Sequence, residues 1–393
     1  MTGLPTDFPA PSSFGELSNH LGLELASWHG EPWAEQKFAR LALQIFAAQF
    51  EGCAPYRRYC SARGIAPESV DHWQRIPPVP TEAFRHVEFQ VASTGRELRF
   101  RTSGTTRGAG ARGVHVVPEP ELYRASLRSA FQQLVLKRVE KELNRSRRSP
   151  ATSVHPLLVS LVPSFDPADG SSLAWMLDDL VGSFGRPGSR SVASASGVDW
   201  EALSRLCDAA AGREHAPPDL AGAPVLLLGT TLAFDAWLRR LGRTGRSWEL
   251  PFGSLLMDTG GVKGREGLDR DAMLRELLPR LGLEPSEVVN EFGMTELLSQ
   301  RYGWGTGRPS LAGPPWLRTL VVDSVSLEPV PDGSEGILCH FDLANAGSVV
   351  AVLTEDRGVR DGGGIKLLGR TPGAPPRGCS LATSDLLRAT EAE

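Results

Sequence analysis

The sequence has few of the features that mark secreted, membrane or nucleic-acid-binding proteins. Its five cysteines form no C-x-x-C pair, so we expect neither a disulfide framework nor a structural zinc site. No stretch approaches the ~20 consecutive apolar residues that a membrane span needs. A formal net charge of −4 provides no excess of Lys and Arg for a polyanion. The first residues also lack the regions of a signal peptide, so we expect a cytoplasmic protein without a nucleic-acid partner.

Several common catalytic motifs are missing as well. The sequence contains no G-x-x-x-x-G-K-[ST], H-E-x-x-H or G-x-S-x-G, which argues against a P-loop NTPase, a zinc metalloprotease and a hydrolase nucleophile elbow. Residues 108–113 fit G-x-G-x-x-G, the dinucleotide-binding fingerprint. That fingerprint must open a helix, and here the β-type run VHVV follows, so we reject it.

The hydrophobic pattern predicts a layered α/β protein. An apolar content of 41% is enough for a sizeable core. Helices are expected over residues 18–50 and 119–142, and short helices between them. Residues 157–300 alternate between strands and helical stretches, which indicates a mainly parallel sheet. The expected strands of that sheet are 157–162, 225–228, 254–258 and 288–291.

The same pattern suggests how the chain is organised. We expect one large domain over residues 1–364, in which residues 1–15 are loose and residues 314–364 form a small β-rich subdomain. The Gly- and Pro-rich stretch 361–378 indicates that residues 365–393 are a short hinge or tail, which carries Cys379.

The strongest local signal for chemistry is the run Thr102–Thr106 (TSGTT), placed after a predicted strand. Hydroxyl groups and backbone N–H groups around one glycine can form a concave loop that binds phosphate oxygens. A Ser/Thr-rich surface turn is the alternative for this stretch alone. Two later segments, 257–261 and 290–296, end predicted strands, where ligands collect in open α/β sheets. Ordinary strand-to-helix turns are the alternative for these two.

Five motifs in this order resemble those of the adenylate-forming superfamily, which includes acyl-CoA synthetases and peptide-synthetase adenylation domains. They are TSGTT (102–106), TGG (259–261), FGMTE (292–296), TED (354–356) and GR (369–370). The resemblance implies that family's large N-terminal domain with layered, mainly parallel sheets, and a truncated C-terminal lid domain. It also implies a ligase that uses ATP and Mg²⁺ to convert a carboxylic acid into an acyl-adenylate.

The resemblance implies a role for each motif. The first loop would bind the ATP phosphates, and the paired glycines would pass beneath the adenine, against which Phe292 would stack. Glu296 would bind Mg²⁺, Asp356 would bind the ribose, and Arg370 would bind the ribose or a phosphate. The implied site residues are Thr102, Ser103, Gly104, Thr105, Thr106 and Arg107 in the loop, and Gly260, Gly261, Phe292, Gly293, Thr295, Glu296, Asp356 and Arg370 after it.

A closer likeness, over residues 55–385, is to the LuxE-type acyl-protein synthetases, which activate fatty acids for reduction to aldehyde. The matching stretches include YRRYC (56–60), GGVKG (260–264), DLAN (342–345) and RGCSLA (377–382). The likeness implies that Cys379 accepts the acyl group as a thioester, for delivery to a reductase or carrier partner. Arg377 would lower the pKa of the Cys379 thiol. The other cysteines, Cys53, Cys60, Cys207 and Cys339, are expected to be small core residues.

Departures from the family pattern leave alternatives open. Arg107 stands where the superfamily usually has Gly, and the sequence has no counterpart of the lid lysine that assists adenylation. Lys263 is a candidate to replace that lysine, and a surface lysine is its plain interpretation. An acyl- or aryl-CoA ligase of the phenylacetate-CoA ligase type is one alternative function. A non-catalytic homologue that binds a nucleotide or a partner is another. The sequence does not identify the acid.

Overall fold

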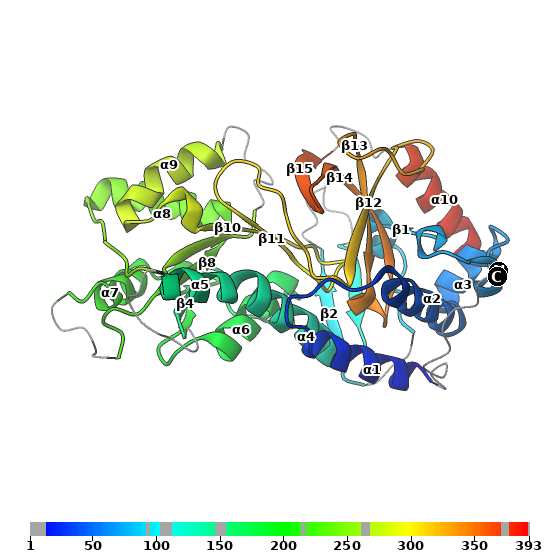
Figure 1. Cartoon of the computed structure of the whole chain (residues 1–393), viewed down its shortest axis with the longest axis horizontal. Coiled ribbons are helices and arrows are strands. Elements are labelled where there is room, and N and C mark those ends of the chain that lie inside the picture. The colour runs from blue at the N-terminus through cyan, green and yellow to red at the C-terminus, as the bar shows by residue number, and fades with distance from the viewer. Residues whose placement is uncertain are drawn as a thin grey trace.

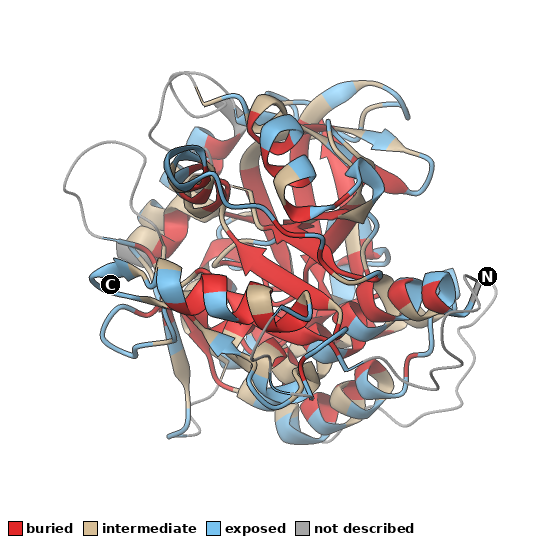
Figure 2. Ribbon diagram, turned by 90° about the vertical axis from the view of Figure 1, so that its left-hand side faces the viewer, coloured by how far each residue is buried: buried red, intermediate tan, exposed pale blue. Residues whose placement is uncertain are grey.

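The structure is a computed structural model, which describes residues 13–91, 95–102, 112–145, 155–213, 217, 219–260, 268–370 and 377–391. The two larger β-sheets lie side by side, and each is covered by helices, while β2-β3 and β6-β7 form two-stranded sheets (Figure 1). The strands are largely buried between helices whose outer faces are exposed (Figure 2). Among the described helices, none has the length and apolar character that crossing a membrane requires.

The first sheet has six strands in the order β11-β10-β9-β8-β4-β5. All neighbours are parallel except β10 and β11, which confirms the predicted, mainly parallel sheet. The strand β10 is followed by β11 rather than by the helix we expected. The bounds are β4 (Leu157–Ser160), β5 (Arg190–Ser191), β8 (Val225–Gly229), β9 (Leu255–Asp258), β10 (Val288–Phe292) and β11 (Arg301–Trp304).

Helices cover both faces of this sheet, because alternate strand residues point to opposite sides. One face, with Leu157 and Leu227, packs against α7, α8 and α9. The other face, with Leu158 and Leu226, packs against α4 and α6. The bounds are α4 (Pro120–Phe131), α6 (Ser172–Phe184), α7 (Trp200–Ala210), α8 (Thr231–Thr244) and α9 (Arg270–Leu281).

The second sheet follows the order β1-β14-β13-β12, with β15 paired to β14. Its strands β12 (Leu317–Val322), β13 (Glu335–Asp342), β14 (Ala351–Asp361) and β15 (Gly364–Arg370) are antiparallel, as expected for a β-rich segment after residue 314. The short strand β1 (Val79–Pro80) joins them in parallel from the N-terminal part of the chain. The sheet is therefore assembled from segments far apart in the sequence.

The remaining elements are helices near both termini and short connecting pieces. They are α1 (Phe14–Ala26), α2 (Glu35–Gly52), α3 (Ala54–Ser61), η1 (Pro67–Ser69), η2 (Trp73–Arg75), η3 (Thr81–Arg85), β2 (Leu98–Arg101), β3 (Val114–Val117), η4 (Gln132–Leu136), α5 (Lys137–Arg145), β6 (Ala193–Ser194), β7 (Gly197–Val198), η5 (Pro285–Glu287), η6 (Leu343–Asn345) and α10 (Arg377–Glu391). The helices expected between residues 18 and 142 are present. Residues 1–12, most of the segment expected to be loose, lie outside the described residues.

The expectation of a hinge or tail over residues 365–393 is wrong for the part that the structure describes. Residues 364–370 form β15 within the second sheet, and α10 packs against α3, β1 and β14. The buried residues Cys379, Ala382 and Leu386 follow one face of α10. The row of residues with helical spacing is short, and it follows a Gly- and Pro-rich stretch. The sequence therefore did not indicate a helix there. Residues 371–376 lie outside the described residues.

Trp316 ties the N-terminal helices to the segment that follows Glu296. Its ring is fully buried and lies edge-on to Trp28, with ring centroids 5.1 Å apart. Its Nε1 donates hydrogen bonds to Ser126 Oγ at 2.9 Å and Ser299 Oγ at 3.1 Å. The indole therefore fills a large volume and also joins α4 to the chain just beyond the FGMTE motif.

We predict that Trp316→Ala lowers the free energy of unfolding by about 3–5 kcal/mol, because it leaves a large cavity and removes the hydrogen bonds from Nε1 to two buried hydroxyl groups. Urea denaturation monitored by circular dichroism measures this loss. As a control, Leu23→Ala on α1, where Leu23 is 72% exposed, changes stability by less than about 0.5 kcal/mol. Equal stability of both variants would contradict the central role of Trp316.

Candidate active site

The hairpin of β2 and β3 carries the predicted phosphate-binding loop at its turn. Arg101 on β2 pairs with Val114 on β3, and the stem of the hairpin ends at the next pair, Thr102 and Gly113. There the Thr102 N–H donates to the Gly113 carbonyl, and the Gly113 N–H donates to Thr102 Oγ1, both at 2.9 Å. The predicted strands before and after the loop are confirmed. Ser103, Gly104, Thr105, Thr106 and Arg107 lie outside the described residues.

The stem of this hairpin lies beside the FGMTE motif. His115 on β3 contacts the Thr295 carbonyl through Nδ1 at 2.6 Å. Burial lowers the pKa of His115 to about 4, so the ring is neutral near pH 7 and its Nδ1–H is assigned as the donor. Ser172 at the start of α6 contacts Thr295 through the two hydroxyl groups at 3.3 Å. Segments from three regions of the chain thus meet at Thr295.

Glu296 is held from the side of the second sheet. Its backbone carbonyl accepts a hydrogen bond from Asn345 Nδ2 at 2.9 Å. The carbonyl of Asn345 in turn accepts one from Gln49 Nε2 at 3.1 Å. Glu296 is buried, with an exposed fraction of 8%. Asn345 belongs to the DLAN stretch, so the structure gives that stretch a structural role that sequence reasoning had not assigned.

The carboxyl ends of β8, β9 and β10 share one buried network around Asp258. Thr231 Oγ1 donates to Asp258 Oδ1 at 2.9 Å, and Arg270 Nε donates to Asp258 Oδ2 at 2.5 Å. Arg270 also donates to the side-chain oxygen of Asn290 on β10. Sequence reasoning missed Thr231 and Arg270, because nothing local indicates which partner a buried Asp will take.

Asp258 also fixes the turn that begins the paired-glycine motif. Its Oδ1 accepts a hydrogen bond from the Gly260 N–H at 3.0 Å. Gly260 has φ of +68°, in the left-handed region that favours glycine, and a Cβ built there would meet no heavy atom within 4 Å. One side of this backbone is therefore open, as a flat ring passing over it requires. Gly261 and Lys263 lie outside the described residues.

Phe292 lies between the two sheets. It ends β10, and its ring lies 5.7 Å from that of His340 on β13, at an angle of 41°. The side chain is only half-buried, which leaves part of the ring open for another contact. Its stacking on an adenine stays a prediction.

Asp356 and Arg370 are brought together, as the resemblance implies. They are register partners on β14 and β15, and Arg370 Nε lies 3.1 Å from Asp356 Oδ1. The Asp356 N–H donates to Thr354 Oγ1 at 3.1 Å. This pair belongs to the second sheet, in a group of contacts separate from that around Thr295.

Cys379 lies beside the same TED motif, but its environment differs from the one expected. Its thiol donates to the Thr354 carbonyl at 3.5 Å and is 4% exposed. Burial raises the pKa of Cys379 to about 12, and the negative charge of Glu355 adds to this. The expected lowering of that pKa is therefore wrong for this conformation. The Arg377 side chain lies outside the described residues. Cys53, Cys60, Cys207 and Cys339 are buried, which confirms their assignment to the core.

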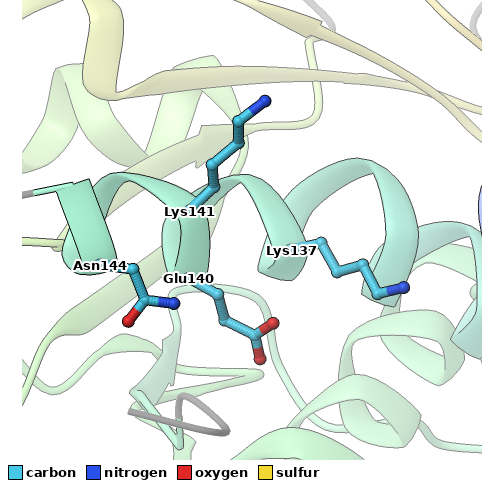
Figure 3. A pocket seen from close by; sticks show the side chains of 4 residues that line it. All are labelled: Lys137, Glu140, Lys141 and Asn144. Carbon is cyan, nitrogen blue, oxygen red and sulfur yellow. The ribbon is translucent and has the colours of Figure 1, made fainter. Parts of the chain in front are cut away.

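The basic helix α5 is the site of a surface hollow unrelated to these motifs. It is lined by Lys137, Glu140, Lys141 and Asn144 (Figure 3). The labelled side chains leave the helix in different directions, with Lys141 and Glu140 on opposite sides of it. The hollow therefore offers no convergent set of groups that would bind a ligand.

A metal ion held by protein groups alone is not indicated. The described residues contain no group of three or more His, Cys, Asp and Glu side chains that could hold one. Mg²⁺ usually takes one or two carboxylates and completes its shell with waters and substrate phosphates. A single carboxylate at Glu296, next to the contact between Thr295 and His115 on the hairpin stem, fits that kind of site.

Glu291 is a buried carboxyl group that sequence reasoning did not single out. It stands between Asn290 and Phe292 on β10, and its exposed fraction is 7%. Burial raises the pKa of Glu291 to about 8, and the charge of Asp258 adds to this. Near neutral pH its protonated, uncharged form therefore predominates.

This raised pKa predicts a specific pH dependence of stability. The folded state holds the Glu291 proton more tightly than the unfolded chain, whose glutamate pKa is about 4.5. Folding is therefore favoured below that value, and the advantage is lost as pH rises to about 8. Relative to Glu291→Gln, wild type should lose on the order of a few kcal/mol between pH 4 and pH 9, from about 1.4 kcal/mol per pKa unit. Parallel urea titrations of both proteins across that range would contradict this if the difference stayed constant.

Part of the chain matches a known protein family. The family model for "Acyl-protein synthetase, LuxE" matches residues 214–388. No curated protein sequence matches the chain.

Among solved structures, one is an open conformation of 2-hydroxyisobutyryl-CoA ligase in complex with 2-HIB-AMP and CoA. It has a TM-score of 0.60 and 14% identity, covering 87% of this chain and 76% of that one. The same ligase in the postadenylation state with R3-HIB-AMP has a TM-score of 0.59 and 12% identity, covering 93% and 72%. At such identities the likeness shows the fold, which is that of the large N-terminal domain of an adenylate-forming ligase.

Proposed function

We propose that this chain, a ligase whose residues 214–388 belong to the LuxE family of acyl-protein synthetases, activates a carboxylic acid with ATP and transfers the acyl group to Cys379. The observation that carries the proposal is the position of Cys379. Its thiol contacts Thr354, two residues before the proposed ribose ligand Asp356. An acyl acceptor is expected close to the site where the adenylate forms.

The described site residues divide into two groups that suit the two ends of ATP. Thr102, Thr295 and Glu296 stand with the hairpin that carries the TSGTT loop, and would face the phosphates. Gly260 and Phe292 would contact the adenine, and the Asp356–Arg370 pair would meet the ribose. These are the roles that the family resemblance implies, and the open side of Gly260 and the half-exposed Phe292 ring support them.

The first reaction needs alignment more than proton transfer. A carboxylic acid with a pKa of about 4 is ionised near neutral pH, so no general base is required. One of its carboxylate oxygens forms a bond to the α-phosphorus, the bond from that phosphorus to the bridging oxygen breaks, and pyrophosphate leaves. Converging hydroxyl and N–H donors of the loop would hold the phosphates in line. Mg²⁺, when bound at Glu296, would offset charge on the leaving pyrophosphate.

The second reaction requires Cys379 to change its surroundings. A thiol with a pKa of about 12 contains almost no thiolate near neutral pH, and the thiolate is the nucleophile. The thiol must therefore leave its contact with Thr354 and lose its proton before it attacks the acyl carbonyl. A thioester bond then forms, the acyl–phosphate bond breaks and AMP leaves. We propose that the acyl group next passes to a reductase or carrier partner, as the family resemblance implies.

A carboxylate at position 296 is essential in this account. We predict that Glu296→Gln lowers acid-dependent exchange between pyrophosphate and ATP by at least about a hundredfold, because it removes the carboxylate that holds the metal ion. Glu276→Gln, an exposed change on α9, serves as the control with unaltered exchange. Full exchange activity in Glu296→Gln would exclude the proposed role.

The acceptor step has a separate test. Cys379→Ser should retain acid-dependent exchange but lose covalent labelling by a radioactive acid, because the adenylate forms without the thiol. Cys207→Ser, at a buried cysteine in the first sheet's core, should retain both activities. Release of the label from wild type by hydroxylamine identifies a thioester.

The CoA ligase alternative gives a different result in the same experiment. It is favoured by the fold shared with 2-hydroxyisobutyryl-CoA ligase and by the burial of Cys379. If Cys379→Ser makes acyl-CoA at the wild-type rate, and wild type carries no hydroxylamine-sensitive label, CoA rather than Cys379 is the acceptor.

A further inference from the structure

A cluster of buried polar groups stands beside the FGMTE motif and has no part in the chemistry described above. Glu291 on β10 and Tyr302 on β11 are register partners, so their side chains lie on the same face of the sheet. This is the face that packs against α4 and α6, opposite to that of Asn290. Glu291, Tyr302 and Gln300 are all at least nine-tenths buried.

Two atoms of this cluster have no hydrogen-bond partner among the described residues, Gln300 Oε1 and the Tyr302 hydroxyl. Leaving a buried polar atom unpaired costs about 1–3 kcal/mol, so such atoms are usually satisfied by a water or a ligand. An amide oxygen accepts hydrogen bonds, a tyrosine hydroxyl both donates and accepts, and the Glu291 carboxyl lies in the same region. The two unpaired atoms therefore favour a partner that can donate a hydrogen bond and also accept one, such as a hydroxyl group.

The cluster borders the proposed reaction centre. A Cβ built on Gly293 would lie 2.6 Å from Glu291 Oε1 and 3.5 Å from Gln300 Cγ. The Glu291 carboxyl therefore lies directly against the backbone of Gly293, in the motif that also contains Thr295 and Glu296. A group bound to this carboxyl would lie beside the FGMTE motif, where we propose that the nucleotide phosphates and the metal ion bind.

Aromatic rings surround the polar groups. The Tyr123 ring stacks on Trp175 of α6 with centroids 4.6 Å apart, and the Phe131 ring lies 6.3 Å from that of Tyr302. Burial raises the pKa values of Tyr123 and Tyr302, and the charge of the nearby Glu291 adds to this. An apolar wall with a few polar groups at fixed positions is the composition typical of a small-molecule site.

We propose that Glu291, Gln300 and Tyr302 select an acid whose carbon chain carries a hydrogen-bond donor, a hydroxyl or an amino group, over the corresponding plain alkanoic acid. The inference rests on the proposed function, and it identifies a substrate class for the same site. A site with unpaired buried polar groups rejects a ligand that cannot satisfy them, because binding then leaves those groups without water or any other partner. When protonated, the Glu291 carboxyl can donate one hydrogen bond to a hydroxyl group of the acid and accept another from it.

The test compares acids that differ only in the polar group. Acid-dependent pyrophosphate exchange is measured with one straight-chain acid and with its monohydroxy and monoamino derivatives substituted at each position along the chain. Wild type should prefer one substituted acid by on the order of a hundredfold in kcat/KM over the plain acid. Comparison of the hydroxy and amino series identifies the donor.

Two variants test whether the cluster is responsible. Glu291→Leu should abolish the preference while retaining exchange with the plain acid. Tyr302→Phe, which removes a single unpaired hydroxyl and leaves no new cavity, should reduce the preference without lowering stability. Tyr59→Phe is the matched control, because the Tyr59 hydroxyl donates to the Pro78 carbonyl far from this sheet, and its preference should equal that of wild type.

Each outcome decides the matter. Equal rates with plain and substituted acids, or a preference unchanged in both Glu291→Leu and Tyr302→Phe, would overturn the inference and leave the proposed function intact, since exchange still occurs. In that case the cluster is structural and binds water. Absence of exchange with every acid would instead refute the proposed function, and the inference with it.

Discussion

Two hydrogen bonds to consecutive backbone carbonyls fix the part of the site on which the rest depends. The Thr295 carbonyl accepts one from the buried, neutral His115 on the hairpin, and the Glu296 carbonyl accepts one from Asn345 next to the second sheet. The FGMTE motif is thus held between the stem of the TSGTT loop and the second sheet. Because neither donor carries a charge, they position Glu296 without competing electrostatically for a phosphate or a cation.

The first sheet brings the other half of the site to the same edge. Parallel strands end at one side of a sheet, so Gly229, Asp258 and Asn290 are register neighbours. The Asp258–Arg270 ion pair, joined by Thr231 and Asn290, holds these ends together. A buried pair of this kind is stabilising chiefly because both charges are fully hydrogen-bonded, and removal of either partner is costly. It therefore acts as a rigid base for the turn that begins at Gly260.

The position of Cys379 bears on the proposed order of the two chemical steps. While α10 is packed against α3 and β14, the thiol is protonated and out of contact with solvent. In the proposed mechanism, acyl transfer from the adenylate to Cys379 follows a movement of this residue, which would keep the thiol from reacting before an adenylate has formed. The same burial protects it from oxidation, since susceptibility follows thiolate content and exposure.

Much of this architecture could be predicted from the sequence, because it depends on local patterns. The apolar runs that form β8 and β9, and the short β-type runs that form β2 and β3, are continuous in sequence, and each strand lies where it was expected. The prediction of a C-terminal hinge or tail was wrong, because the buried face of α10, which includes Cys379 and Leu386, spans only two turns of helix.

The contacts that hold the site could not be predicted. Gln49 and Asn345 are 296 residues apart in the sequence, and His115 and Thr295 are 180 residues apart. No local pattern indicates such pairs. Glu291 was overlooked for a related reason. A glutamate in a strand is read as exposed until the partner strand and the covering helices are known.

The most direct test of the account is pyrophosphate exchange by the purified wild-type protein. With ATP, Mg²⁺ and a panel of carboxylic acids, the account predicts that labelled pyrophosphate enters ATP only when a suitable acid is present. Binding of ATP without any acid-dependent exchange would contradict it, and would show a protein that recognises the nucleotide but forms no acyl-adenylate.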